Sequence, residues 1–91
     1  MLPIRWRASA LNELDAVVAY IAQHNPAAAV ALLERIQSSV LPLSEHPDLF
    51  RLGRVPGTRE IVAHPNYLVV YRVLADCVEV VSVMHTSREH P

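Results

Sequence analysis

The side chains that could carry chemistry gather in the second half of the chain. They are Arg59, Tyr67, Arg72, His85 and Arg88. Histidine titrates near neutral pH without help from its surroundings, so His85 could transfer protons with Tyr67 or Tyr71 beside it. Arginine keeps its charge and offers a planar fork, so the three arginines suit contact with an anion or a carboxylate.

Each of these residues also has a structural interpretation. Arg72 interrupts an apolar stretch, where an unpaired charge is costly. It therefore indicates either an anion or partner site, or an ion pair with Glu60 or Glu79 across a sheet. Arg59 could stabilise the turn before it, and His85 could bond to backbone at the end of a strand. Tyr67 could be a packing residue, and Arg88 could be a solvated charge.

The sequence predicts no metal site and no cofactor. Its five histidines are scattered without an i, i+4 pair, and Cys77 is its single cysteine, so zinc-ligand spacings are missing. Gly53 and Gly57 are the only glycines, and they form no glycine-rich loop for phosphate. Any catalysis would depend on acid–base and cationic side chains alone.

Length and composition predict a single domain over residues 1–91, with apolar surface left for a partner. Of the 91 residues, 52% are hydrophobic, a high share for so small a core. The net charge is −1, without the concentrated positive charge that direct binding to DNA or RNA needs. The lone cysteine, the start without an apolar leader and the lack of a membrane-spanning apolar run favour a cytoplasmic protein with no membrane contact.

The first half of the chain predicts a strand and a helical hairpin. Residues 2–7 alternate apolar and basic, as in a short edge strand. Ser9 is the expected N-cap of a helix that ends near His24. Asn25 and Pro26 then open a second helix, which ends near Pro42. The minimal turn between the helices predicts an antiparallel hairpin.

The second half predicts an antiparallel meander. A loop is expected over 44–57, followed by strands over 58–63, 67–74 and 77–84. The whole is an α+β domain: an N-terminal strand, a two-helix antiparallel hairpin, and a three-stranded antiparallel meander completing one sheet. The hairpin covers one face of this sheet, and no element remains to cover the other. Strand alternation places Val83 and His85 on the same face as Glu79 and Val81.

The sequence contains the stretch GRVPGTREIVAHPNYLVVYRV…VEVVSVMHTSREHP, with YIAQHNPAAA and LPLSEHP before it. In these segments the sequence resembles the RelE/ParE family of toxins from bacterial toxin–antitoxin pairs. The resemblance covers nearly the whole chain. It implies the family fold and one of two activities. RelE-type members cleave messenger RNA in the ribosome, and ParE-type members bind and block DNA gyrase without chemistry of their own.

The residue pattern favours the ParE branch. In the ribonucleases a catalytic arginine lies three residues before the central-strand tyrosine, where this chain has Leu68, and the lysines that those enzymes use are missing. The resemblance thus implies a gyrase inhibitor without catalytic residues. Its candidate target-binding residues are Arg59, Arg72, His85 and Arg88. The alternative is a ribosome-dependent endoribonuclease that uses His85, Arg88 and Tyr67. A third reading is a degenerate member that only binds its antitoxin.

The resemblance also implies a cognate antitoxin, with a segment that is disordered until it binds and folds on the toxin. We expect this segment to dock on the helical hairpin and the sheet edge. Its candidate contacts are the apolar residues Leu14, Val18, Ile21, Val30 and Leu33. DNA binding belongs to the antitoxin in this family, so none is expected from this chain.

Overall fold

The computed structural model describes residues 1–88, with Arg88 described by its backbone alone. Helices α1 (Ala8–Ala22) and α2 (Pro26–Ser39) form a hairpin, and 3-10 turns η1 (Leu41–Ser44) and η2 (Thr86–Arg88) follow α2 and the last strand. The strands are β1 (Ile4–Trp6), β2 (Arg51–Leu52), β3 (Arg59–His64), β4 (Tyr67–Val73) and β5 (Val78–His85). They form one sheet in the order β1-β5-β4-β3-β2.

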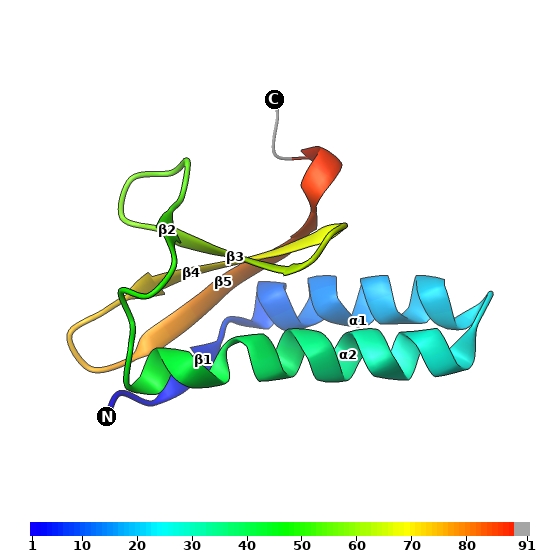
Figure 1. The fold of residues 1–91 in the computed structure, drawn as a ribbon, viewed down its shortest axis with the longest axis horizontal. Helices are drawn as coiled ribbons and strands as arrows, with labels where there is room; N and C mark the ends of the chain where they lie inside the picture. The colour runs from blue at the N-terminus through cyan, green and yellow to red at the C-terminus, as the bar shows by residue number, and fades with distance from the viewer. Residues whose placement is uncertain (89–91) are drawn as a thin grey trace.

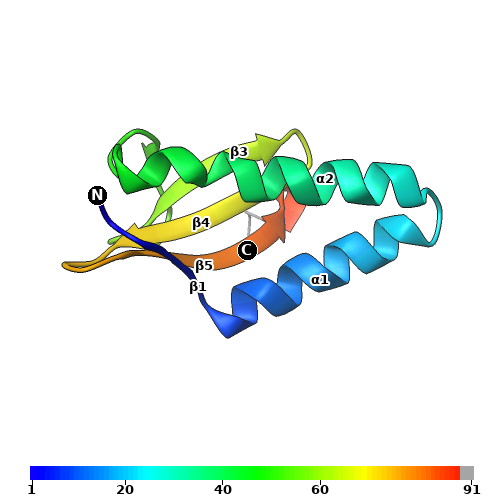
Figure 2. The same cartoon turned by 90° about the horizontal axis from the view of Figure 1, so that it is seen from below.

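The predicted α+β architecture is confirmed. β3, β4 and β5 form the antiparallel meander, and β1 joins it at the edge, parallel to β5. Both helices lie on one side of the sheet (Figure 1) and extend past its end at the hairpin turn (Figure 2).

The hairpin begins its second helix as predicted, but not its first. The side chain of Asn25 accepts the Ala28 N–H at 3.1 Å, and Pro26 occupies the first turn of α2, where its missing N–H costs nothing. The prediction of Ser9 as N-cap of α1 is wrong. The helix begins at Ala8, and Arg7, two residues before Ser9, occupies the cap position without a side-chain cap.

The core lies between the hairpin and the sheet. Ile36 of α2, Leu43 of η1, and Val69, Tyr71 and Val80 of the sheet are all fully buried within it. The phenol hydroxyl of Tyr71 donates to the Pro47 carbonyl oxygen at 2.8 Å, so the one polar atom of that side chain is satisfied.

The sequence predicted a plain loop over residues 44–57, but this segment includes the last residue of η1 and the two-residue strand β2. Arg51 of β2 faces Glu60 of β3, with its Nη2 3.0 Å from the carboxylate. Glu60 is buried, and a buried carboxylate needs such a partner. This ion pair therefore holds β2 against β3, although β2 is too short to show any periodicity in the sequence.

A β-bulge in β5 overturns the face assignment for the end of that strand. Val70 pairs with Ser82 whereas Tyr71 pairs with Val80, so Val81 is an extra residue. Beyond the bulge, Val83 lies opposite Val69 on the helix-covered face. Glu79 lies before the bulge and pairs with Arg72 on the other face.

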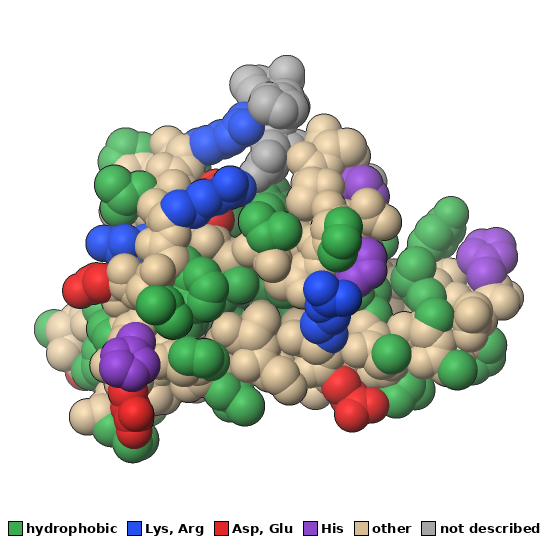
Figure 3. Space-filling view, in the orientation of Figure 1, with side chains coloured by type: hydrophobic (Ala, Val, Ile, Leu, Met, Phe, Trp, Pro, Cys, Tyr) green, Lys and Arg blue, Asp and Glu red, His purple; other side chains and the backbone are tan. Residues whose placement is uncertain are grey.

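The face away from the helices is partly covered, contrary to the sequence expectation. Leu68 points to this face and is only 1% exposed. The β2–β3 connection and η2 both rise on this side of the sheet, at its opposite ends (Figure 1). Arginine side chains gather at the end that carries β2 (Figure 3), where Arg51 and Arg54 are exposed.

Candidate functional site

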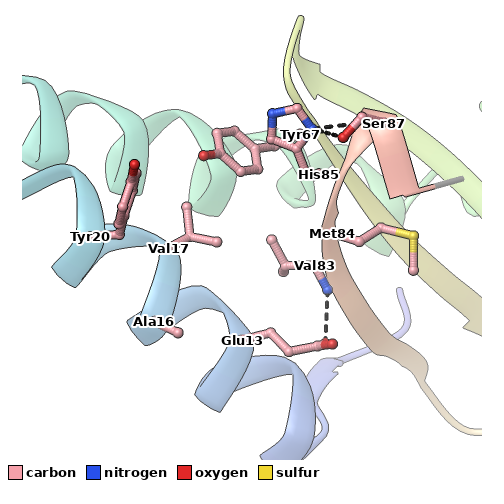
Figure 4. A pocket seen from close by; sticks show the side chains of 9 residues that line it. All are labelled: Glu13, Ala16, Val17, Tyr20, Tyr67, Val83, Met84, His85 and Ser87. Carbon is pink, nitrogen blue, oxygen red and sulfur yellow. Dashed lines mark hydrogen bonds between the residues drawn. The ribbon is translucent and has the colours of Figure 1, made fainter.

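A groove of about 610 Å³ lies between α1 and the second half of β5 (Figure 4). Helix α1 supplies one wall, and β4, β5 and η2 supply the other. The lining residues are Glu13, Ala16, Val17, Tyr20, Tyr67, Val83, Met84, His85 and Ser87. Its floor is apolar, and its polar groups lie towards the two ends.

Two of the predicted catalytic candidates meet at one end of this groove. The rings of Tyr67 and His85 stack edge to face with their centroids 5.2 Å apart. His64 approaches Tyr67 from the β3 side, with centroids 5.8 Å apart. The bulge in β5 makes the first contact possible, since it brings His85 onto the Tyr67 face.

The hydrogen bonds of His85 define what its imidazole can do. Its Nδ1 accepts the backbone N–H of Ser87 at 3.1 Å and lies 2.8 Å from the Ser87 hydroxyl oxygen. A ring nitrogen that accepts a backbone N–H carries no proton, so the neutral ring holds its proton on Nε2. His85 therefore stabilises the start of η2 and presents a donor, not a free base.

The same local pattern occurs at His64. Its Nδ1 accepts the backbone N–H of Asn66 at 3.0 Å, again two residues further on. Both histidines beside Tyr67 are thus held by the chain segments that follow them. This supports the backbone-bonded interpretation that the sequence left open for His85.

At the other end of the groove, Glu13 bridges α1 and β5. Its Oε1 accepts the backbone N–H of Val83 at 3.2 Å and the hydroxyl of Ser82 at 3.0 Å. This contact joins residues far apart in the sequence, and periodicity of either element gives no sign of it.

Arg72 has the structural partner that the sequence offered as one alternative. Its Nε lies 2.8 Å from Oε1 of Glu79, and Nη2 of Arg7 lies 3.0 Å from the same oxygen. The hydrogen bond from Arg72, together with Arg7, holds the pKa of the Glu79 carboxyl below its ordinary value. Two cations share one carboxylate here, so the cluster keeps a net positive charge.

The three predicted target-binding residues whose side chains the structure describes do not form one site. Arg59 lies opposite Tyr71 in the sheet register, and its Nη1 donates to the Phe50 carbonyl at 2.8 Å. Arg72, next along β4, therefore points to the opposite face. His85 lies in the groove, and the side chain of Arg88 lies outside the described residues.

The predicted antitoxin contacts differ in their accessibility. Leu14 is buried in the core. Val18, Ile21 and Leu33 are partly buried against it, and Val30 is 57% exposed. Tyr20, which the sequence did not single out, is 61% exposed and stacks on His24 near the hairpin turn. Among these hairpin residues, the two that are most exposed therefore lie near that turn.

Within residues 1–88, no cluster of three metal-ligating side chains occurs. None of the helices described is long and apolar enough to cross a bilayer.

The family model for the ParE toxin of type II toxin–antitoxin systems, parDE, matches residues 4–90. The chain belongs to this toxin family. It is the toxin component of a type II pair, and that class implies a cognate antitoxin as its partner.

Relatives agree with this assignment, and a solved structure shares the fold. The toxin is 42% identical to Y4kP of Sinorhizobium fredii, across 97% of this chain and 92% of the relative. It is 33% identical to toxin RelE2 of Caulobacter vibrioides, across 97% and 99%. Its fold superimposes on a chain of the chromosomal ParDE TA system from P. aeruginosa with a TM-score of 0.82, across 93% and 96% of the two chains at 20% identity.

Proposed function

We propose that the toxin inhibits DNA gyrase by protein–protein contact in the cytoplasm, and that its cognate antitoxin relieves this inhibition. The observation that carries the proposal is the hydrogen bonding of His85. A general base must accept a proton. The Nδ1 of His85 is occupied by Ser87, and Nε2 of the neutral ring already carries a proton.

The cationic groups needed for phosphoryl transfer are also poorly placed. Such chemistry needs positive charge fixed beside the reacting phosphate. Arg59 and Arg72 lie on opposite faces of the sheet, and each is engaged by a protein oxygen. Leu68 stands where the family resemblance implies the arginine of the ribonuclease branch, and it is buried.

Contact with the target is proposed through Arg59, Arg72, His85 and Arg88. Arg72 offers the best-defined surface of these. It keeps 42% of its side chain exposed, and the two cations Arg7 and Arg72 give their cluster with Glu79 a net positive charge. A partner surface that carries a carboxylate fits this cluster.

The test uses one preparation of toxin in two assays. Purified gyrase is assayed for supercoiling with increasing toxin, and ribosomes programmed with messenger RNA are assayed for cleavage. We expect loss of supercoiling and intact messenger RNA. Unchanged supercoiling at a large excess of toxin would overturn the gyrase proposal.

The edge-to-face contact of Tyr67 and His85 favours a second candidate, a ribosome-dependent endoribonuclease. This candidate predicts toxin-dependent cleavage in the ribosome assay. It also predicts that replacing Tyr67, His85 and Arg88 together by alanine abolishes toxicity. Retained toxicity in a folded triple variant would exclude it.

For the antitoxin, we propose docking on the groove between α1 and β5 and on the hairpin, where Tyr20 and Val30 are exposed. A segment that folds on binding would bury this apolar surface. Hydrogen exchange of the toxin should slow in α1 and β5 when the antitoxin is added. Unchanged exchange in both elements would contradict this placement.

A further inference from the structure

The outer edge of β5 is only partly paired. β1 lies beside Val78, Glu79 and Val80, and its last bond to this edge runs from the Arg7 N–H to the Val80 carbonyl at 3.0 Å. Among the described residues, no strand lies beside the rest of β5 on that side. The Val83 N–H points outward there, and strand alternation points the His85 backbone the same way. An exposed edge of this kind can pair with another chain.

Glu13 occupies the first open position on that edge. Its carboxylate accepts the Val83 N–H, as the dashed line in Figure 4 marks, although a neighbouring strand would supply a backbone carbonyl here. Glu13 is exposed, and the side chain can rotate away without disturbing the core. The bond is thus replaceable at small cost.

We infer that the Glu13 carboxylate occupies the free Val83 N–H on the β5 edge only in the absence of the antitoxin. An extended segment of the antitoxin then displaces this side chain and pairs with β5 from Val83 to His85. The inference rests on the proposed antitoxin partnership and assigns its mode of contact. The backbone of the segment supplies the carbonyl for Val83, and alternate side chains face the apolar floor at Val17.

Charge decides what the segment must carry. Glu13 is the only charged carboxylate among the groove-lining residues, and none of them is an arginine or lysine. Once displaced, its carboxylate loses both protein donors and lies at the groove wall as an unpaired negative charge. A lysine or arginine in the segment, placed opposite Glu13, complements this charge. The partner is therefore an extended peptide segment with apolar residues and one basic residue.

The experiment measures exchange of the Val83 amide by NMR, in the free toxin and in its complex with the antitoxin encoded beside the toxin gene. Three variants are compared with the unmodified toxin: Glu13→Ala, Glu13→Gln and Asp15→Ala. Glu13→Gln keeps an acceptor oxygen. Asp15→Ala removes an exposed carboxylate from the same helix and serves as the matched control.

In the free toxin, Glu13→Ala should speed Val83 exchange on the order of tenfold, the value of one hydrogen bond to a charged acceptor. Glu13→Gln and Asp15→Ala should change it less than about threefold, because each leaves Val83 an acceptor. In the complex, Val83 should be protected beyond the level of the free toxin. That protection should be equal with and without Glu13, because the antitoxin backbone has replaced it.

The results that would overturn the inference can be distinguished from one another. A complex that forms while Val83 in Glu13→Ala exchanges as fast as in the free variant overturns the inference and leaves the antitoxin partnership intact. Failure of any complex to form overturns both. Val83 protection that rises with toxin concentration alone assigns the edge to a second copy of the chain, and the inference is then wrong.

Discussion

Arg72 and Glu79 face each other across β4 and β5, with 2.8 Å between the guanidinium Nε and the carboxylate Oε1. Arg7, which precedes α1, reaches the same oxygen. The cluster therefore ties the edge strand, the first helix and the centre of the sheet through one carboxylate. An apparently isolated charge in an apolar strand has a structural partner and still keeps a partly exposed cationic surface.

The Glu79 cluster should make stability depend on pH. The lowered pKa of Glu79 means that its contribution is complete above the ordinary value of 4.5 and is lost as the pH falls through the lowered pKa. Glu79→Gln should thus be less stable than the unmodified toxin at pH 7, and the difference should shrink below pH 4.5. Urea unfolding of both proteins from pH 7 to pH 3 measures this. An equal difference at both ends of that range would contradict the assignment.

Tyr71→Phe should lower the free energy of unfolding by about 1 kcal/mol, because it removes the bond to Pro47 from a fully buried side chain. Burial also raises the pKa of the Tyr71 phenol, so the hydroxyl stays protonated and donates. Thermal unfolding should show a Tm lower by about 4–8 °C. The control is Tyr20→Phe at a 61% exposed position, which should change stability by less than about 0.5 kcal/mol. Equal effects of the two changes would sink the prediction.

The variant His85→Asn distinguishes a role of His85 in target contact from a role in catalysis. The side-chain carbonyl oxygen of the introduced asparagine can accept the Ser87 N–H in place of the imidazole Nδ1, and its amide keeps a donor. The toxin dose for half-maximal gyrase inhibition should therefore rise by less than about tenfold, the cost of one altered hydrogen bond. Loss of a general base would instead lower a ribosomal cleavage rate by about 10²–10⁴. A drop of that size in a folded variant would favour the ribonuclease reading.

Asn25→Ala should destabilise the toxin by about 1 kcal/mol, because it removes the N-cap of α2. Asn12→Ala is the matched control. Asn12 is exposed within α1, where alanine has the higher helix propensity, so this change should be neutral or slightly stabilising. Chemical denaturation of both variants checks the opposite signs. A loss of stability in both would indicate that the cap bond is not the cause.

Local signals in the sequence were sufficient for most of the fold. Asn25 followed by Pro26 defines a helix start through bonds within one turn, and the predicted bounds of β3, β4 and β5 are correct to one residue. The ion pair of Arg72 with Glu79 was also foreseeable as one of two alternatives, because a charge at a central position needs a partner.

What could not be predicted depends on contacts between distant segments. β2 is two residues long and is held by Arg51 and Glu60, so it has no periodicity of its own. The groove needs Glu13 of α1 beside Val83 of β5, and nothing local to either residue indicates the other. The bulge was hidden because Val80 and Val81 are identical residues, and either could have been the inward one.

The extra residue in β5 also bears on how such toxins can diverge. Val81 is the unpaired residue of the bulge, so deleting it would leave a regular strand with Val83 still opposite Val69 and His85 still opposite Tyr67. The bulge thus absorbs one residue without changing which face carries the C-terminal end of the sheet. Loss of this one residue would therefore leave the Tyr67–His85 contact and the groove in place.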